Sequence, residues 1–347
     1  MRPRWIAIFY AIVISTSLVT PNPVPLIVDT DIGGGACKDV DDVAAISVAH
    51  ALTTLGEANL LAIVVNTKPA EGVGVVSVLN EWYGRSDLPI GAYKGDAISD
   101  VSGQLPYVEE LVTGWPSKVK NSSQVSDATI IYRRALASQA DRSVAIASIG
   151  LMTNLEALLR SQGDEISPLD GVELVRQKVR LLVAMAGTYP KSATLLPECN
   201  MCGCYNAATP QDILAASSAS EYVFSRMPSE VRVIFSGSEV GLRVQSGGRL
   251  SSCQPVSCPS RAAFENFGGG PNRSRFSWDP LSTLVAVRGP EGAYTALCDD
   301  CAGHNVVNGT TGSNVWDNGK STNQTYLVLR DAVKAGEALD NLLCRDP

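Results

Sequence analysis

Apolar residues along this chain gather in short runs, which alternate with longer segments where apolar positions recur at helical spacing. The short runs predict β-strands at 26–30, 60–66, 89–93, 144–149, 179–186 and 231–235. The intervening segments predict helices at 42–52, 74–83, 127–138, 154–159, 212–219, 279–288 and 331–343. Strands and helices in alternation are typical of a parallel sheet covered by helices on both faces. The predicted fold class is therefore α/β, with an open, mostly parallel (mixed) central sheet.

Local signals refine this pattern. Thr209 followed by Pro210 predicts a helix start, with Asp212 in the first turn. From 236 to 270 the pattern weakens into Gly, Ser and two cysteines, which we interpret as a surface excursion. Because no linker divides the chain, we predict a single domain over 23–347.

The first residues have the composition of a targeting signal. Arg2 and Arg4 precede an apolar run at 5–14, and small polar residues follow at 15–17. This order predicts a secretory signal peptide at 1–22. The run is shorter than the roughly twenty residues that a spanning helix needs, so we expect a secreted, extracellular protein without a membrane anchor. The net charge of −7 argues against nucleic acid as a partner.

The cysteine content fits an oxidising compartment. Nine cysteines are present, with Cys-x-x-Cys spacing at 199–202 and 298–301. In an exported chain this predicts disulfides rather than a thiolate metal site, and the odd count leaves at least one thiol unpaired or bonded to another chain. Four sequons, at Asn121, Asn272, Asn308 and Asn323, predict a glycoprotein, but the closeness of Asn272 to the segment 278–281 argues against a glycan at that position.

A turn rich in acids separates the first predicted strand from the first predicted helix. It holds five carboxylates within fourteen residues, at Asp29, Asp31, Asp39, Asp41 and Asp42. Ligands of open α/β sheets bind at this end of the strands. Like charges so close need a counter-charge, and Ca²⁺ with its six to eight oxygen ligands is the simplest one. The alternative is a solvated acidic loop.

Four later segments are expected at the same edge of the sheet. Each lies at or just after the end of a predicted strand, or where we expect the chain to return to the edge that holds the acidic turn. They are 65–67 (Val-Asn-Thr), 150–155 (Gly-Leu-Met-Thr-Asn-Leu), 198–200 (Glu-Cys-Asn) and 278–281 (Trp-Asp-Pro-Leu). Taken alone, Thr153 could simply begin a helix, and Asp279 before Pro280 could be a helix cap.

Together with the acidic turn, these segments resemble the inosine–uridine-preferring nucleoside hydrolase family, in order from Val24 to about Ala286. The resemblance implies a Rossmann-like nucleoside hydrolase fold. It also implies Ca²⁺-dependent hydrolysis of the N-glycosidic bond of ribonucleosides, giving free base and ribose. Relatives are commonly dimers or tetramers, so a homo-oligomer is implied as well.

The resemblance assigns roles to particular residues. It implies Ca²⁺ ligation by Asp31, Asp42, Asp279 and the backbone carbonyl of Thr153, with Asp31 also accepting a proton from the attacking water. It implies substrate binding by Asp41, Asn66, Glu198, Asn200 and Trp278. Of these, Asp41, Glu198 and Asn200 would bind ribose hydroxyls, and Asn66 would lie beside both ion and ribose.

The chain departs from the family pattern in two places. Pyrimidine-tolerant members carry His where this chain has Trp278, which instead resembles the purine-preferring branch that stacks the base between aromatic rings. Trp115 or Tyr107 could supply the second ring, and the alternative reading of Trp278 is a core or rim residue. Neither His50 nor His304 is a candidate acid for the leaving base, and the identity of that acid stays open.

The second departure lies before Glu198, where Ser192 stands in a region that carries a ribose-binding Asn in the family. The turn also has extra residues at 34–38, among them Cys37. A bridge from Cys37 to one of Cys199, Cys202 or Cys204 would fasten the acidic turn to the predicted ribose-binding segment.

Two other classes of function remain open. An exported, non-enzymatic Ca²⁺-binding protein on the same scaffold would also need the acidic turn. A haloacid dehalogenase-like phosphatase also begins with Asp-x-Asp after a strand, but it uses Mg²⁺ and a second acidic pair far downstream.

Overall fold

The computed structural model describes residues 22–34, 37, 39–68, 71–95, 98, 105–191, 197–203, 209–320 and 322–347. The predicted signal peptide lies almost wholly outside the described residues, as do Ser192 and Cys204. Among the residues described, no helix has the length and apolar character needed to cross a membrane.

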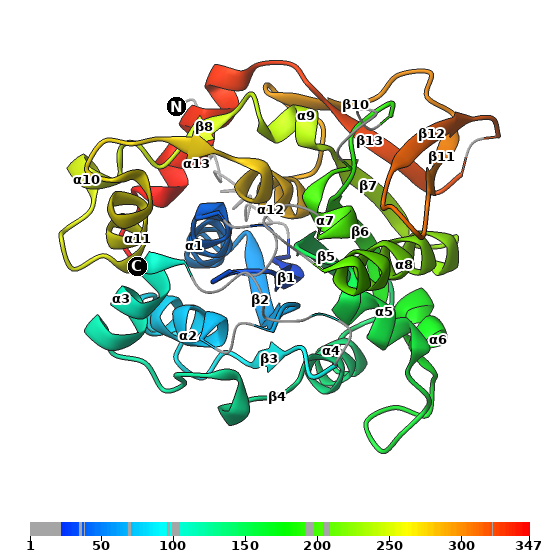
Figure 1. Ribbon diagram of the computed structural model, residues 1–347, viewed down its shortest axis with the longest axis horizontal. Coiled ribbons are helices and arrows are strands. Elements are labelled where there is room, and N and C mark those ends of the chain that lie inside the picture. Colours follow the sequence, from blue (N-terminus) through cyan, green and yellow to red (C-terminus); the bar gives the residue numbers. More distant parts are fainter. Residues whose placement is uncertain are drawn as a thin grey trace, which may run out of the picture.

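The centre of the molecule is a sheet of nine strands (Figure 1). In spatial order they are β10 (Thr295–Leu297), β13 (Gln324–Leu329), β7 (Arg232–Ser236), β6 (Val179–Met185), β5 (Val144–Ile149), β1 (Val24–Thr30), β2 (Ala58–Val65), β3 (Ile90–Ala92) and β4 (Ser126–Asp127). All neighbours pair in parallel except β10 and β13. All six predicted strands are confirmed, as is the mostly parallel mixed sheet.

The strand order reverses at β1, because the chain builds β2 to β4 on one side and β5 to β7 on the other. Ligands of open α/β sheets bind at such a switch point, outside the carboxyl ends of the strands. The acidic turn follows β1 directly, so the topology places it at this point.

Helices cover both faces of the sheet. On β1, Leu26 and Val28 belong to one core and Ile27 to the other, as the alternation of side chains along a strand requires. The first core includes α1 (Asp41–Thr54), α2 (Gly72–Trp82), α12 (Trp278–Arg288) and α13 (Ala332–Leu343). The second includes α4 (Ala128–Ala137), α5 (Thr153–Arg160), α6 (Gly171–Lys178) and α8 (Pro210–Arg226), on the other side of the sheet in Figure 1.

The start of α8 is as predicted. Thr209 accepts a hydrogen bond from the backbone N–H of Asp212, and the Asp212 carboxylate accepts one from the N–H of Thr209. This is a reciprocal capping box, and it satisfies two backbone donors that a helix start would otherwise leave unpaired.

The interpretation of 236–270 as a surface excursion is partly wrong. The segment contains the helices α9 (Ser238–Gly241), α10 (Leu250–Cys253) and α11 (Pro259–Gly268). Ala263 and Phe264 of α11 are buried in the first core. Two of these helices have only four residues, too few for a helical period to be visible in the sequence.

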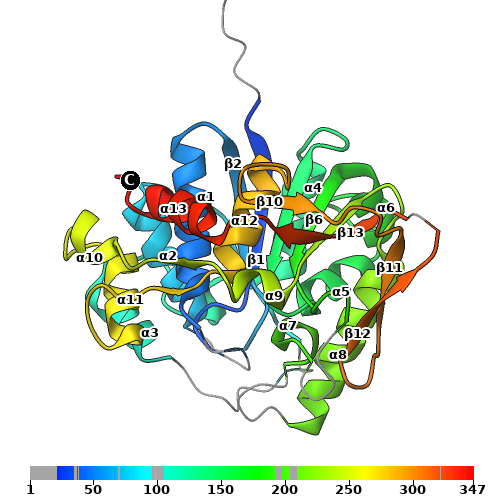
Figure 2. The same cartoon turned by 90° about the horizontal axis from the view of Figure 1, so that it is seen from above.

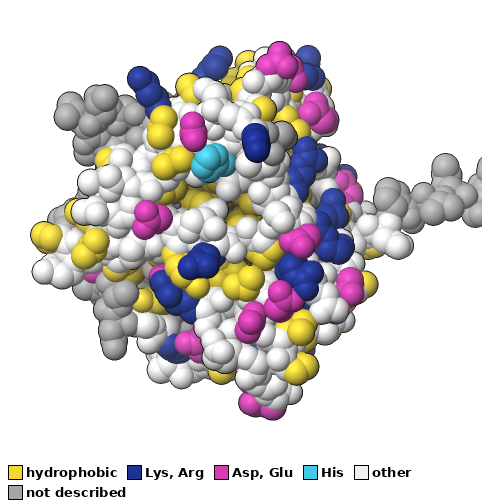
Figure 3. Space-filling view, turned by 90° about the vertical axis from the view of Figure 1, so that its right-hand side faces the viewer, with side chains coloured by type: hydrophobic (Ala, Val, Ile, Leu, Met, Phe, Trp, Pro, Cys, Tyr) yellow, Lys and Arg dark blue, Asp and Glu magenta, His cyan; other side chains and the backbone are white. Residues whose placement is uncertain are grey.

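The chain ends with a hairpin and a helix that lie on different sides of the molecule. Figure 2 shows α13 beside α1, and the hairpin of β11 (Gly303–Val307) and β12 (Asn314–Asn318) beside α8. Trp316 of the hairpin joins an aromatic cluster with Tyr189 and Tyr326, with ring centroids 5.0–5.9 Å apart. On the face shown in Figure 3, acidic and basic side chains are interspersed.

His50 is a buried core residue, as the sequence indicated, and it gives a prediction about stability. Its ring stacks on Tyr83 and bonds Asn80 at 2.9 Å, while burial, followed by the charge of Arg85, lowers its pKa to about 3. An unfolded chain binds this proton near pH 6.5, so protonation favours unfolding as pH falls below that value.

Between pH 7 and pH 5, we expect His50 to lower the free energy of unfolding by about 2 kcal/mol. Urea unfolding of the wild type and of His50→Gln at both pH values would measure this difference. Equal pH dependence of the two proteins would contradict the prediction.

Candidate active site

A cavity of about 610 Å³ opens at the carboxyl ends of the central strands. Its lining residues come from the acidic turn, the ends of β5 and β6, the segment 197–200, the helix α9 and the start of α12. Elements more than two hundred residues apart in the chain thus meet at the switch point of the sheet.

Three carboxylates form a cluster at the floor of this cavity. Asp31 follows β1, Asp42 lies in the first turn of α1 and Asp279 in the first turn of α12. Each offers an oxygen within 4.8 Å of the others, and all three residues are buried. The structure therefore brings together the three acids for which the resemblance implied a shared ion.

The donor set of this cluster fits a hard cation. Oδ2 of Asp31 is buried and has no hydrogen-bond partner among the described residues. Burial, followed by the charges of neighbouring aspartates, raises the pKa of Asp31 and Asp279 well above the usual range. Carboxylate oxygens at this spacing are the ligands that Ca²⁺ prefers, and a bound cation would relieve both the repulsion and the unpaired oxygen.

Asp41 lies next to this cluster and also lines the cavity. Its Oδ2 accepts a hydrogen bond from the backbone N–H of Asp279 at 3.2 Å, which links the starts of α1 and α12. Burial, followed by the charges of Asp39 and Asp42, raises the pKa of its carboxyl group.

The protein itself satisfies two of the five acids in the turn. Asp29 accepts hydrogen bonds from the amides of Asn66 and Asn154 and from the hydroxyl of Tyr132, at 2.8–3.0 Å. Asp39 forms a bidentate ion pair with Arg275, with N–O distances of 2.6–3.0 Å. A cation is therefore not the partner of Asp29 or Asp39, and of the five acids only Asp31, Asp41 and Asp42 remain for an ion and a ligand.

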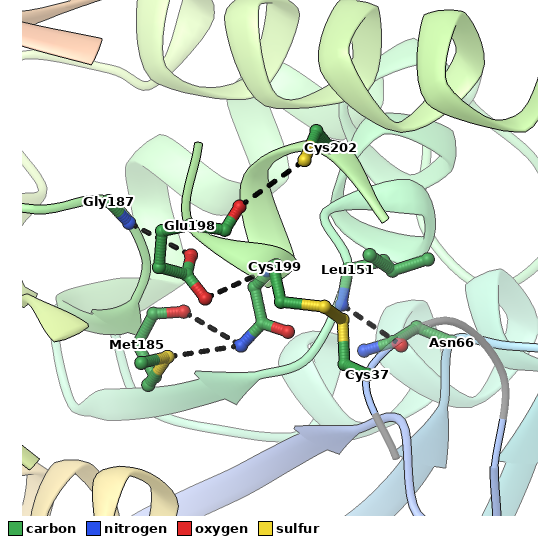
Figure 4. Close-up of a disulfide and its surroundings, with 9 residues drawn as sticks. Cys37, Asn66, Leu151, Met185, Gly187, Glu198, Cys199 and Cys202 are labelled. Carbon is green, nitrogen blue, oxygen red and sulfur yellow. Dashed lines mark hydrogen bonds between the residues drawn. A yellow bond between two sulfur atoms is a disulfide. The ribbon is translucent and has the colours of Figure 1, made fainter. Parts of the chain in front are cut away.

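Asn66 and Thr153 are buried and are not among the described residues that line the cavity. The Asn66 side chain donates to Asp29 and accepts from the N–H of Leu151 at 3.1 Å (Figure 4), while the Thr153 hydroxyl donates to the Asn66 carbonyl at 2.8 Å. A side chain at Gly150 would collide with this amide and with the backbone of Asp31. Asn66 thus joins the ends of β1, β2 and β5, and its role toward a ligand stays a prediction.

Glu198 and Asn200 line another wall of the cavity. Glu198 directly precedes the short helix α7 (Cys199–Cys202) (Figure 4), and Asn200 lies in its first turn. Glu198 accepts hydrogen bonds from the N–H groups of Asn200 and Gly187, at 2.9 and 3.0 Å. Asn200 donates to the carbonyl of Met185 at 3.0 Å. Burial raises the pKa of Glu198 to about 7, and these backbone hydrogen bonds oppose the rise.

The segment 187–189, which follows β6, is held by side chains from three parts of the chain. Its consecutive N–H groups donate to Glu198, to Asn314 of β12 and to Glu239 of α9, at 3.0–3.1 Å. Asn314 also donates back to the carbonyl of Thr188 at 3.1 Å. Buried backbone groups need such partners, and here the partners fix the wall of the cavity.

A disulfide joins Cys37 of the acidic turn to Cys199 (Figure 4), with the two Cα atoms 5.8 Å apart. Both cysteines line the cavity. The hypothesis that Cys37 fastens the turn to this segment is thereby confirmed. Further pairs are Cys253–Cys344 and Cys298–Cys301, and Cys258 is a buried free thiol, so the prediction of disulfides with an unpaired cysteine holds.

Replacing Cys37 and Cys199 by serine should lower the free energy of unfolding by about 2–5 kcal/mol, because the bridge closes a very long loop. It should also weaken cation binding, since the acidic turn loses its tie to α7. Urea unfolding and calorimetry with Ca²⁺ measure the two effects.

The matched control for this change is the double serine variant of Cys253 and Cys344, a disulfide outside the cavity lining. That variant should lose stability and keep its cation affinity. Equal affinity in both variants would show that the Cys37 bridge does not position the turn.

Trp278 begins α12 and lines the cavity. Its indole N–H donates to the carbonyl of Ser238 at 2.9 Å, and its ring packs against Phe276 with centroids 5.2 Å apart. The two candidates for a second ring do not line the cavity. Trp115 donates to the carbonyl of Ser257, and Tyr107 is fully buried, because α3 (Pro106–Gly114) packs on α11.

Sequence reasoning missed Glu239, which lines the cavity from α9. Its Oε2 accepts a hydrogen bond from the N–H of Tyr189, and burial raises its pKa to about 7. The available signal was its place three residues after the end of β7, since polar residues at such positions reach the ligand edge of a parallel sheet.

Comparisons with known proteins yield matches in structure alone. No family model matches the sequence, and no curated protein matches it either. A plant nucleoside hydrolase, the PpNRh1 enzyme, superposes with a TM-score of 0.61 at 18% identity, over 93% of this chain and 99% of the other. An inosine–uridine-preferring nucleoside hydrolase from Bacillus anthracis gives 0.62 at 12% identity, over 92% and 99%.

The fold also occurs in a protein described as an effector. The type III effector protein XopQ, solved in complex with adenosine diphosphate ribose, superposes with a TM-score of 0.64 at 15% identity, over 93% of this chain and 92% of the other. Likeness at these identities concerns architecture. This chain has the fold of the nucleoside hydrolases, the inosine–uridine-preferring ones included.

Proposed function

We propose that this protein is a Ca²⁺-dependent hydrolase that cleaves the N-glycosidic bond of ribonucleosides. The observation that carries the proposal is the cluster of Asp31, Asp42 and Asp279 at the floor of a cavity whose wall holds Glu198 and Asn200. A cation site and a polar wall for hydroxyl groups are what this reaction needs side by side. The nucleoside hydrolase fold supports the proposal.

The residues at the floor suit an attack by water on the sugar. When bound, Ca²⁺ would supply a site that orients a water molecule and makes it more acidic. Oδ2 of Asp31, for which the described residues provide no hydrogen-bond partner, accepts the proton of the attacking water. The breaking N-glycosidic bond leaves positive charge on the ribose ring, and the surrounding carboxylates stabilise it.

The walls suit a ribonucleoside. Asp41, Glu198 and Asn200 bind the ribose hydroxyls, since carboxylates accept and amides donate hydrogen bonds at fixed geometry. Trp278 offers its ring to the base, and stacking is worth about 0.5–1.5 kcal/mol beyond the area that it buries. We infer a preference for purines, whose two fused rings cover more of the indole.

Incubating the purified protein with Ca²⁺ and each of inosine, adenosine, guanosine, uridine and cytidine tests the function. We expect release of free base and ribose, fastest with the purines. No base from any ribonucleoside, together with measurable Ca²⁺ binding, would instead support the non-enzymatic calcium-binding protein. Release of phosphate from a generic ester without release of base would support the phosphatase.

We also propose that the protein is exported, because the described disulfides form and persist in oxidising compartments. Glycans fit best at Asn308, which is exposed, and Asn272 is exposed too although its closeness to 278–281 argued against a glycan there. Asn323 is less suited, since its side-chain nitrogen donates to the carbonyls of Pro228 and Val231.

A further inference from the structure

The departing base needs a proton, and neither histidine is placed to give it. A nitrogen base leaves poorly as an anion, so hydrolysis is faster when an acid protonates it. His50 is buried against Tyr83 in the core, and His304 is exposed on β11. Neither is among the described residues that line the cavity.

Most carboxyl groups in the cavity already have another task. Three belong to the cluster of Asp31, Asp42 and Asp279, here called the triad. Asp39 pairs with Arg275, and the backbone N–H groups of Gly187 and Asn200 donate to the two oxygens of Glu198. Asp41 accepts from the backbone at the start of α12, close to the triad. Glu239 is the acid of the cavity that stands apart from the triad and its neighbours.

The position of Glu239 is fixed on the side of the cavity where the base would stack. Its neighbour Ser238 accepts the indole N–H of Trp278 through the backbone carbonyl. Its own carboxylate is held by the N–H of Tyr189 and folds over Gly237, where any side chain would collide with it. The carboxyl group is therefore positioned by the same short helix that anchors the tryptophan.

On this geometry we propose that Glu239 is the catalytic acid that protonates the leaving base, an inference that rests on the proposed hydrolase function. As the bond between C1′ and the base nitrogen breaks, its electron pair moves into the base. The carboxyl proton of Glu239 passes to a ring nitrogen of the base. The water oxygen bonds C1′ and gives its proton to Asp31. Asp31 then releases this proton to solvent, and solvent returns a proton to Glu239.

The surroundings of Glu239 leave its carboxyl group partly protonated near neutral pH. Burial raises its pKa to about 7, and the hydrogen bond from Tyr189 opposes the rise. The titratable groups that face it are Tyr189 and Tyr326, with Glu198 across the segment 187–189. An acid with this pKa donates a proton while remaining partly protonated at the working pH.

Comparing Glu239→Gln with the wild type on two substrates tests the proposal. The amide oxygen keeps the hydrogen bond from Tyr189 but the amide gives no acidic proton. With inosine, we expect kcat to fall by at least about 100-fold and the loss of rate above pH 7 to disappear. With 4-nitrophenyl β-ribofuranoside, whose leaving group needs no proton, we expect kcat to change by less than about threefold.

The controls separate this inference from the proposed function. Glu337→Gln, on the exposed side of α13, should behave as the wild type with both substrates. A wild type that hydrolyses neither substrate overturns the hydrolase function and this role with it. Equal losses on both substrates in Glu239→Gln, with an active wild type, overturn the acid role alone.

A second variant guards against failure of Glu239→Gln to fold. Gly237→Ala keeps the carboxyl group of Glu239, but the added methyl group displaces that carboxyl group from its position. It should also lose activity toward inosine and keep activity toward the nitrophenyl riboside. Retention of full inosine activity in this variant would contradict the proposal.

Discussion

Asp42→Asn should abolish tight Ca²⁺ binding and lower kcat/KM for inosine by more than about 100-fold, since loss of a group that merely supports a metal ligand already costs about 10–100-fold. The substitution removes one of the three charges that face the ion and keeps the shape of the side chain. The hydroxyl of Thr30, which donates to Oδ1 of Asp42, still finds an acceptor. Calorimetry on chelator-treated protein and steady-state kinetics with excess Ca²⁺ measure the two losses.

The matched control for this change is Asp87→Asn, because Asp87 is exposed and pairs only with Lys118 among the contacts described for it. It should bind Ca²⁺ and turn over inosine as the wild type does. Full turnover by Asp42→Asn, or no calcium uptake by the wild type, would remove the basis of the proposed function.

2′-Deoxyinosine should be a poor substrate, with kcat/KM lower than that of inosine by a factor on the order of 10³–10⁴. Asp41, Glu198 and Asn200 are all buried, and a missing hydroxyl would leave polar groups without a partner inside the cavity. The cost of an unpaired buried group is larger than the gain from the bond itself, so the discrimination is steep. Parallel assays of free base with both nucleosides measure the ratio.

The variant Asp41→Asn identifies the origin of this discrimination. If the carboxylate of Asp41 binds a ribose hydroxyl, the ratio of kcat/KM for inosine to kcat/KM for 2′-deoxyinosine should fall at least about tenfold in the variant. Asp87→Asn should leave the ratio unchanged. Equal rates for the two nucleosides in the wild type would refute the ribose-binding roles.

The central strands were predictable because they are buried on both faces, which gives short, continuous apolar runs between helices of a different period. The edge strand β4 has only two residues, and β10 has three, so neither carries a readable pattern. The four-residue helices α9 and α10 were missed for the same reason, and with α9 the position of Glu239.

The acidic floor of the cavity was predictable because strand ends meet at one edge of a parallel sheet. The partners of Asp29 and Asp39 could not be predicted from the sequence. Arg275 reaches Asp39 from 236 residues further along the chain, and Tyr132 reaches Asp29 from a helix on the second core. Such contacts depend on side-chain packing between distant elements, which spacing in a sequence does not express. The partner of Cys37 could likewise be narrowed to three cysteines but not chosen among them.

The hairpin β11–β12 looks in Figure 2 like an appendage at the end of the chain, yet Asn314 holds both backbone groups of Thr188 at the cavity wall. A chain shortened before β11 would lose β13 of the central sheet, release Thr188 from Asn314, and remove Trp316 and Tyr326 from the aromatic cluster around Tyr189. A molecule that binds the hairpin and displaces Asn314 would also displace Thr188 in the cavity wall. The C-terminal region is thus an integral part of the pocket's architecture, and trimming it would damage a region that begins more than a hundred residues earlier.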